Sequence, residues 1–326
     1  MRILPIITVF ILLSQYGHAE DEPLQLLERI PLPGVTGRID HLAIDTKNKR
    51  LFIAALGNDS LEVVDLRKRK RVRSVTGFRE PQGVLFLTDS DRLVVSNGGD
   101  GKCLLIDATT FETVRQFDLH EDADNLRYDV TARKLYVAYG SGAVAIFDNM
   151  LEKIGDIPLP GHPEAFALDG DRDRLYINVP STHTVVVADL ESRREMEAWR
   201  LRDGGWNFPM ALDEDAHVVL VGVRHPSRID GFDVETGNLA FTVPIDGDPD
   251  DIFIDSGRRR VYVSCGAGFL DVLEWSDSDG YRVVKKVTTA PGARTALFVP
   301  EMQRLFLAVP RRGKQTAAVW VYAVNG

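Results

Sequence analysis

The chain has 326 residues, with 39 Lys or Arg against 48 Asp or Glu, and its formal net charge at pH 7 is −9. This acidic balance argues against general binding to nucleic acids or to anionic membrane surfaces. Only two cysteines occur, and they form no CxxC pair, which argues against a structural zinc site and against covalently attached c-type haem.

Residues 1–19 predict a secretory signal peptide. They contain one basic residue, Arg2, an apolar run over 3–13, and the sequence Gly17-His18-Ala19 just before the first acidic residues. An apolar run of about 11 residues is too short to span a membrane, and small residues at this spacing are typical of a cleavage site. We therefore expect cleavage after Ala19. The mature protein, residues 20–326, is then periplasmic or secreted and has no membrane span.

Residues 38–75 introduce a unit that recurs along the rest of the chain. In this copy, four short segments rich in Val, Ile, Leu and Phe are separated by polar turns, which is the pattern of consecutive antiparallel strands. The second strand of each copy starts at Leu51, Leu93, Leu135, Leu175, Val218, Val261 and Leu305. The steps of 42, 42, 40, 43, 43 and 44 residues match the repeat of a four-stranded propeller blade. The sequence therefore predicts an all-β fold: one seven-bladed β-propeller with four-stranded antiparallel blades.

The two ends of the mature chain are predicted to close the ring. The last unit holds only three strands, around 293–299, 304–309 and 317–322. Residues 24–32 are rich in apolar residues and precede the first complete unit, so they are the remaining strand candidate. We expect this N-terminal strand to pair with 317–322 in the C-terminal blade, because that pairing removes two open sheet edges. Cys103 and Cys265 fall in separate repeats, and we expect both to be buried free thiols.

The first strand of each blade supplies the candidate site residues, because these strands line the axis of a propeller. Aligning the seven strand starts gives one equivalent position per blade, occupied by Asp40, Gln82, Asp124, Glu164, Phe208, Asp250 and Thr295. Four of these seven side chains are acids. Carboxylates gathered near one axis repel one another, which raises their pKa values unless a cation, a metal or Arg side chains compensate.

From these strand starts we predict a ligand-binding funnel at one mouth of the central channel. Its candidate residues are Arg38, Asp40, His41, Gln82, Asp124, Asn125, His162, Glu164, Asn207, Asp250, Asp251 and Arg294. One interpretation is that these acids and arginines pair with one another and only hold the blades in register. The others are binding of a metal or of a cationic or polar ligand, and a catalytic acid–base pair, although we assign no catalytic residue.

The turns between second and third strands are expected on the same face as this funnel. Several of them carry His or Arg that a turn does not require, namely His183, Arg224, His225, Arg311 and Arg312. These side chains are either peripheral ligand contacts or solvated surface charges.

Histidines give weak support for a metal. His41 and His162 begin first strands and, with nearby acids, could supply a mixed nitrogen and oxygen coordination sphere. The sequence has no HExxH motif, no EF-hand loop, no GxSxG elbow and no P-loop or Rossmann fingerprint. A divalent metal ion is compatible with this sequence, but nothing in it requires a metal or another cofactor.

The repeats resemble those of the YVTN-repeat, YncE-like seven-bladed propellers of exported bacterial proteins. The shared feature is a second strand followed by a turn and an apolar strand that ends in Asp, as in 175–178 with 185–189 and in 51–54 with 61–65. The resemblance extends over nearly all of residues 24–322, although no blade reproduces the Thr-Asn pair of the family signature intact. It implies the propeller fold and an exported protein. It assigns no activity, since related propellers include lactonase-like enzymes and redox proteins.

Three functional hypotheses follow. We favour a non-catalytic exported scaffold that binds a protein partner or a small polar ligand through its funnel and loop face. The alternative is a metal-dependent, lactonase-like hydrolase in which funnel carboxylates and His41 or His162 hold a divalent ion that activates water. A weaker alternative is a redox partner that carries a haem or a quinone-derived group. The hydrolase requires several acids and a histidine within one coordination sphere, whereas a scaffold does not.

Overall fold

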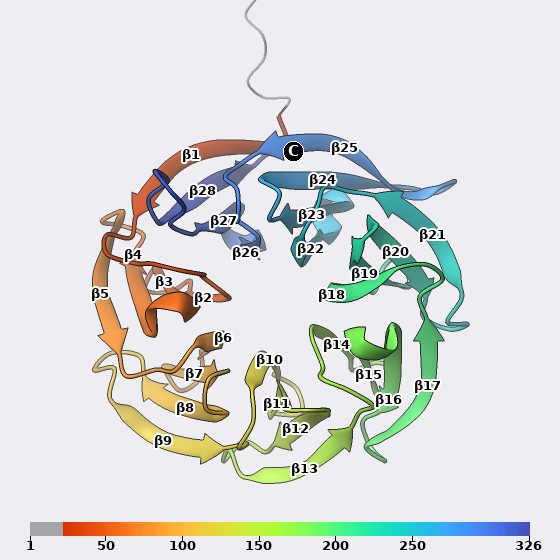
Figure 1. Ribbon diagram of the computed structural model, residues 1–326, viewed down its shortest axis with the longest axis horizontal. Coiled ribbons are helices and arrows are strands. Elements are labelled where there is room, and N and C mark those ends of the chain that lie inside the picture. The colour runs from red at the N-terminus through yellow and green to blue at the C-terminus, as the bar shows by residue number, and fades with distance from the viewer. Residues whose placement is uncertain (1–21) are drawn as a thin grey trace, which may run out of the picture.

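Seven four-stranded antiparallel sheets stand around a central axis and form a closed β-propeller (Figure 1). This computed structural model describes residues 22–326, so the predicted signal peptide, residues 1–19, lies outside the described residues. The helices of the described chain are short 3-10 turns: η1 (Leu56–Asn58), η2 (Pro180–Thr182), η3 (Ser256–Arg258) and η4 (Pro300–Met302). None of them is long and apolar enough to cross a membrane. The predicted all-β, seven-bladed fold is confirmed.

Six blades are each built from four consecutive strands, counted from the axis outward. The first two are β2 (Leu42–Asp45), β3 (Arg50–Ala55), β4 (Ser60–Asp65) and β5 (Lys70–Thr76), then β6 (Pro81–Leu87), β7 (Arg92–Asn97), β8 (Lys102–Asp107) and β9 (Thr113–Asp118). The third and fourth are β10 (Ala123–Asp129), β11 (Lys134–Tyr139), β12 (Ala143–Phe147) and β13 (Lys153–Pro158), then β14 (Phe166–Asp169), β15 (Arg174–Val179), β16 (Thr184–Asp189) and β17 (Arg194–Arg200). The fifth and sixth are β18 (Gly205–Asp213), β19 (Val218–His225), β20 (Ser227–Asp233) and β21 (Leu239–Pro244), then β22 (Pro249–Asp255), β23 (Arg260–Cys265), β24 (Phe269–Ser276) and β25 (Gly280–Thr288).

The seventh blade joins the two ends of the described chain. It consists of β26 (Thr295–Val299), β27 (Arg304–Val309), β28 (Ala318–Val324) and, as its outer strand, β1 (Leu24–Pro31). β1 runs antiparallel to β28, with Leu24 opposite Val324 and Ile30 opposite Val319. The predicted closure is confirmed, and it satisfies the backbone groups of the inner edge of β1 and the outer edge of β28.

The hydrophobic cores lie between adjacent blades. One cluster packs Leu51 and Ile53 of β3 against Phe306 of β27 and Val319 of β28. The middle strands of each blade are therefore apolar on both faces, whereas the outer strands β5 and β17 expose most of their residues. A blade cannot bury both faces alone, so the ring of blades is the unit that is stable. Cys103 and Cys265 are buried and free, as predicted.

β-bulges shape the inner ends of four first strands. The pairing register shifts after Pro81 in β6, after Ala123 in β10, after Asn207 in β18 and after Pro249 in β22. Each bulge contains the aligned axial residue of its blade, namely Gln82, Asp124, Phe208 and Asp250. A bulge re-aims side chains relative to the sheet, and it is common beside functional sites.

Hydrogen bonds fix the turns after the second strands beside these inner ends. Gly98 donates its N–H to the carbonyl of Glu80 at 2.9 Å, and Gly266 donates to Asp248 at 2.7 Å. The expectation that these turns lie on the face of the funnel is confirmed.

Candidate functional site

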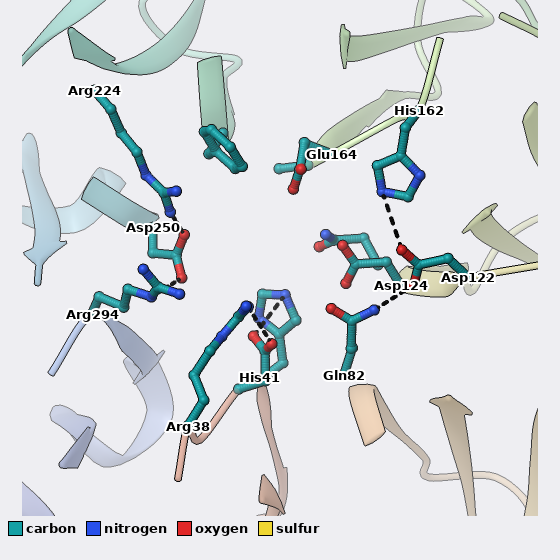
Figure 2. Close-up of a pocket in the computed structure, with 14 residues that line it drawn as sticks. Arg38, His41, Gln82, Asp122, Asp124, His162, Glu164, Arg224, Asp250 and Arg294 are labelled. Carbon is teal, nitrogen blue, oxygen red and sulfur yellow. Dashed lines mark hydrogen bonds and ion pairs between the residues drawn. The ribbon is translucent and has the colours of Figure 1, made fainter. Parts of the chain in front are cut away.

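A polar chamber of about 280 Å³ opens at one mouth of the central channel (Figure 2). Ten of the predicted funnel residues line it: Arg38, Asp40, His41, Gln82, Asp124, Asn125, His162, Glu164, Asp250 and Arg294. Four further residues complete its wall: Asp122, Ala165, Phe208 and Arg224. The chamber is therefore assembled from side chains of all seven blades, which explains why no compact sequence motif marks it.

Two predicted funnel residues do not line the polar chamber. Asn207 is fully buried, and its Nδ2 donates to Asn178 Oδ1 and to the Thr184 carbonyl, each at 2.9 Å, which ties the fourth and fifth blades together. Asp251 lies on the far side of His41, in another part of the channel. At both positions a β-bulge interrupts the strand, so that neighbouring side chains face different places. Their neighbours Phe208 and Asp250 face the chamber instead.

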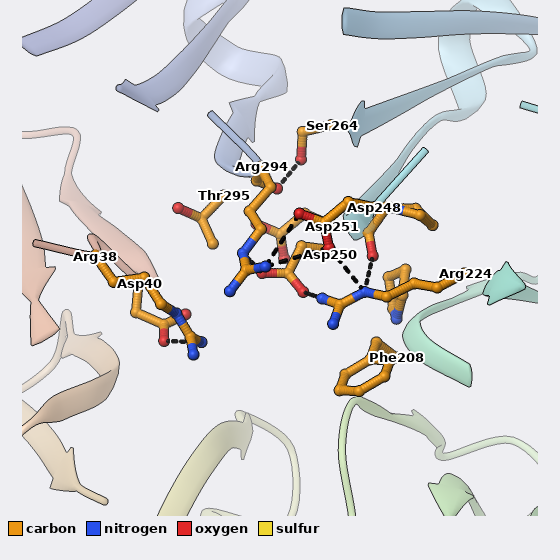
Figure 3. Close-up of polar contacts among 12 residues, drawn as sticks. Arg38, Asp40, Phe208, Arg224, Asp248, Asp250, Asp251, Ser264, Arg294 and Thr295 are labelled. Atoms are coloured by element: carbon orange, nitrogen blue, oxygen red, sulfur yellow. Dashed lines mark hydrogen bonds and ion pairs between the residues drawn. The ribbon is translucent and has the colours of Figure 1, made fainter. Parts of the chain in front are cut away.

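The arginine side of the chamber is a four-membered charge network (Figure 3). Arg224 Nε lies 3.1 Å from Asp248 Oδ1, and its Nη2 contacts Asp250 Oδ1. Arg294 Nη1 lies 3.1 Å from Asp248 Oδ2, and its Nε lies 3.0 Å from Asp250 Oδ2. Each arginine thus bridges both acids, and the four formal charges cancel. Burial raises the pKa of Asp250, and the two arginines oppose this effect.

Phe208 and Arg38 complete the arginine side. The guanidinium carbon of Arg224 lies 3.7 Å from the centre of the Phe208 ring, a cation–π contact that holds the side chain in place. Arg38 Nη2 donates to Asp40 Oδ2 at 2.7 Å, and this is the one hydrogen bond of its guanidinium within residues 22–326. Burial opposes the charge of Arg38, but Asp40 and the other acids outweigh burial and raise its pKa. Because a guanidinium has five N–H donors, Arg38 keeps donors for a ligand.

The carboxylate side carries Asp122, Asp124 and Glu164 from the third and fourth blades. Asp122 Oδ1 accepts a hydrogen bond from Gln82 Nε2 at 2.7 Å, and its Oδ2 lies 4.0 Å from His162 Nε2. The other ring nitrogen of His162 lies 2.6 Å from the Gly140 carbonyl, which orients the ring. By contrast, the side chains of Asp124 and Glu164 line the chamber and make no hydrogen bond or ion pair within the described chain.

These two unpaired carboxyls have strongly raised pKa values. Burial, followed by repulsion from Asp40, raises the pKa of Asp124 to about 6. Burial, followed by repulsion from Asp124 and Asp250, raises the pKa of Glu164 to about 9. Burial and mutual repulsion therefore favour retention of a proton on this pair of carboxyls. The pair can accept a cation, and Glu164 can donate a hydrogen bond.

Asn125 places a buried acceptor in the wall of the polar chamber. The residue is only 4% exposed and lines the polar chamber, and its Oδ1 has no hydrogen-bond partner among residues 22–326. A buried acceptor without a donor destabilises a fold by about 1–3 kcal/mol, so native proteins rarely leave one unsatisfied. A donor group of a bound molecule would satisfy it.

His41 forms the floor of the chamber, between two acids. Its Nε2 lies 3.9 Å from Asp40 Oδ1, and its Nδ1 lies 3.7 Å from Asp251 Oδ1. Burial disfavours the imidazolium, but Asp251 and Asp40 outweigh it, so the pKa of His41 is raised. Burial also raises the pKa of Asp251 to about 7, although the backbone N–H of Ala296 donates to its Oδ2 at 2.8 Å.

The described residues do not fit the divalent metal of the hydrolase hypothesis. Within residues 22–326, no group of three or more His, Cys, Asp or Glu side chains is placed to hold a metal ion. Asp40 and Asp250 are paired with arginines, so Asp124 and Glu164 are the two chamber acids without a hydrogen bond or ion pair in the described chain. Two carboxyls fall short of the several acids and one histidine that this hypothesis requires.

Sequence reasoning missed part of the arginine side. Arg224 was expected at most as a peripheral contact, because the sequence suggested a turn there, whereas the structure places it near the end of β19. Asp248, which directly precedes β22, was not among the candidate residues. The shared face of turns and strand starts indicates only that Arg224 is near the funnel. That it crosses to Asp250 and Phe208 depends on the packing of the fifth blade against the sixth.

No protein-family model and no curated protein sequence matches this chain. Among solved structures, a chain of hydrazine synthase from Kuenenia stuttgartiensis superposes with a TM-score of 0.73 at 17% identity, over 85% of this chain and 95% of that one. A chain of the mitotic checkpoint complex superposes with a TM-score of 0.79 at 13% identity, over 100% of this chain and 99% of that one. The chain is a seven-bladed β-propeller. At these identities, the similarity shows the fold alone.

Proposed function

We propose that this protein is a binding protein for a small zwitterionic molecule, which it holds in the polar chamber without converting it. The observation that carries the proposal is the placement of hydrogen-bond donors and unpaired carboxyls across one cavity. Arg38, Arg224 and Arg294, each paired with an acid, offer their remaining N–H donors on one side. The unpaired carboxyls of Asp124 and Glu164 stand on the other side (Figure 2).

A zwitterion uses both sides of the chamber. Its ammonium group would contact Asp124 and donate to Asn125 Oδ1, the buried acceptor that lacks a partner. Its anionic group would accept hydrogen bonds from the arginine N–H groups that do not bond to Asp40, Asp248 or Asp250. A simple cation would leave those donors unused, and a simple anion would face the carboxylate side, so either should bind more weakly.

The size of the chamber limits the ligand. A volume of 280 Å³ corresponds to roughly nine water molecules at ~30 Å³ each. An amino acid or a molecule of similar size fits this space, whereas a peptide chain does not. Recessed charges at the axis therefore favour a small molecule over a protein partner, although the surrounding loop face leaves room for a partner as well.

We also propose that the protein acts outside the cytoplasm, as a YncE-like exported scaffold. The composition of residues 1–19 and the repeat pattern of 24–322 support this part of the proposal.

The proposal can be tested with straight-chain ω-amino acids of increasing length. Trp206 provides a signal, since it is 53% exposed and its ring centre lies 6.5 Å from that of Phe208 in the chamber wall. Tryptophan fluorescence and calorimetry should detect one or more zwitterions that bind at least tenfold more tightly than the alkylamine and the alkyl carboxylate of equal length. Such a ratio corresponds to about 1.4 kcal/mol.

Variants locate this binding. Asp124→Asn should weaken it at least tenfold, whereas the matched change Asp118→Asn, on the outer strand β9, should leave it unchanged. The proposal is wrong if singly charged analogues bind as tightly as the zwitterions, or if Asp124→Asn binds them as the unaltered protein does.

A further inference from the structure

A second cavity occupies the other half of the central channel. Beyond His41, the channel continues as an apolar chamber of about 540 Å³ that receives side chains from the first strands of all seven blades. Representative wall residues are Leu42, Leu85, Phe166, Leu212, Phe253 and Leu297. A concave, mostly apolar cavity with a few polar groups is the usual form of a small-molecule site.

Arg127 of β10 is the one arginine in this wall. Its Nη1 donates to the carbonyl of Leu126 at 2.8 Å, and its guanidinium carbon lies 5.4 Å from the centre of the Phe166 ring. It forms no ion pair with any residue of the described chain. Burial lowers the pKa of Arg127, but arginine stays protonated in proteins. The Arg127 guanidinium, which has N–H donors without a hydrogen bond in the described chain, therefore faces apolar surface.

The other charged groups of the apolar chamber do not neutralise Arg127 directly. Asp251 accepts the Ala296 N–H and lies beside His41, so its interaction with Arg127 is electrostatic and acts from beyond ion-pair distance. Glu214 is exposed and follows the end of β18. Charge that is partly removed from water is destabilising unless it is paired, which makes an external anion favourable here.

We propose that the apolar chamber binds an apolar monocarboxylate, with the carboxylate on Arg127 and the hydrocarbon part among the inner strands. The inference is independent of the polar chamber and of its ligand. The volume of 540 Å³ equals roughly 18 water molecules at ~30 Å³ each, which accommodates a chain of about eight to ten carbons. Each buried methylene contributes about 0.8 kcal/mol, so affinity should rise roughly fourfold per added carbon until the chamber is filled.

Calorimetry of the purified protein with octanoate, hexanoate, octanol and octylammonium tests this inference. We expect octanoate to bind at least tenfold more tightly than octanol and about 15-fold more tightly than hexanoate, and octylammonium to bind least. Octylammonium binding as tightly as octanoate, or no binding of octanoate, overturns the proposal, and this comparison needs no variant.

Variants then locate the carboxylate. Arg127→Met should remove the preference for octanoate over octanol, whereas Arg127→Lys, which keeps the charge, should retain most of it. Arg133→Met is the matched control, because Arg133 is exposed in the turn that follows β10. Equal octanoate affinity of Arg127→Met and the unaltered protein, with both shown to be folded by thermal melting, refutes the assignment to Arg127.

Discussion

Replacing Asp124 by Asn should make the fold more stable at alkaline pH. Asp124 is 7% exposed and makes no hydrogen bond or ion pair through its carboxyl within the described chain. In the folded protein its pKa is about 6, above the ordinary value of 3.8, because of burial and repulsion from Asp40. A carboxyl with a raised pKa binds its proton more tightly in the folded state. Its contribution to stability is present below pH 4 and is lost as the pH rises through 6.

The size of the effect follows from the two pKa values. A rise from 3.8 to about 6 corresponds to about 3 kcal/mol of folding free energy that is lost between pH 4 and pH 8. Asn does not titrate, so the variant escapes this loss. Relative to the unaltered protein, Asp124→Asn should therefore gain about 3 kcal/mol between these pH values, whatever the packing of the amide adds at both. For a chain of this size the gain corresponds to roughly 5 °C in Tm.

Urea unfolding followed by circular dichroism at pH 4, 6 and 8 measures this difference. Asp45→Asn is a matched control of opposite sign. Burial disfavours the charge of Asp45, but hydrogen bonds from Asn48 and Arg50 outweigh burial and lower its pKa. This control should lose stability at pH 8 and little below pH 3. If the stability difference between Asp124→Asn and the unaltered protein does not change with pH, then the pKa of Asp124 is not raised in the folded protein.

Three further outcomes are expected. Ile30→Ala in the closing strand should lower the free energy of unfolding by about 2–5 kcal/mol, whereas Leu27→Ala, 47% exposed on the same strand, should change it by less than about 0.5 kcal/mol, as urea titrations would show. Gly83→Ala would place a methyl group against the carbonyl of Asp124, so it should lower stability by about 1–3 kcal/mol. The same change should weaken ligand binding in the polar chamber. Unchanged binding would contradict a link between packing at Gly83 and the position of Asp124. Arg294→Gln leaves Asp248 and Asp250 with one arginine between them and should reduce stability at pH 7 by about 1–3 kcal/mol. An unaltered urea midpoint would mean that the charge network contributes nothing.

The stability of the polar chamber bears on its function. Asp124, Glu164 and Asn125 each oppose folding through a raised pKa or an unpaired acceptor. Residues that destabilise a fold and persist in it are expected at binding sites, where a ligand supplies what the protein lacks. A ligand that pairs with these groups should therefore raise the Tm, and the rise should grow with the logarithm of the ratio of ligand concentration to Kd.

The sequence by itself determined the architecture. The spacing of the second strands predicted seven blades, and the three-stranded last unit together with residues 24–32 predicted the closure by β1. The number of blades and the closure by β1 can both be predicted from local patterns, because strand periodicity and turn residues depend on a few neighbouring positions of the chain. The alignment of strand starts also placed ten of twelve predicted residues in the wall of one chamber, since equivalent positions of a repeat occupy equivalent places around the axis.

Only the tertiary structure decided which of two neighbouring side chains faces the polar chamber and which charged groups form pairs. Bulges direct Asp250 and Phe208 into the polar chamber and keep Asp251 and Asn207 out of it. The apolar pattern of a strand does not reveal a one-residue shift of this kind. The pairing of Arg224 with Asp250 joins side chains 26 positions apart in two different blades. Charge pairing and burial depend on distances between blades, and those distances exist only once the ring has closed.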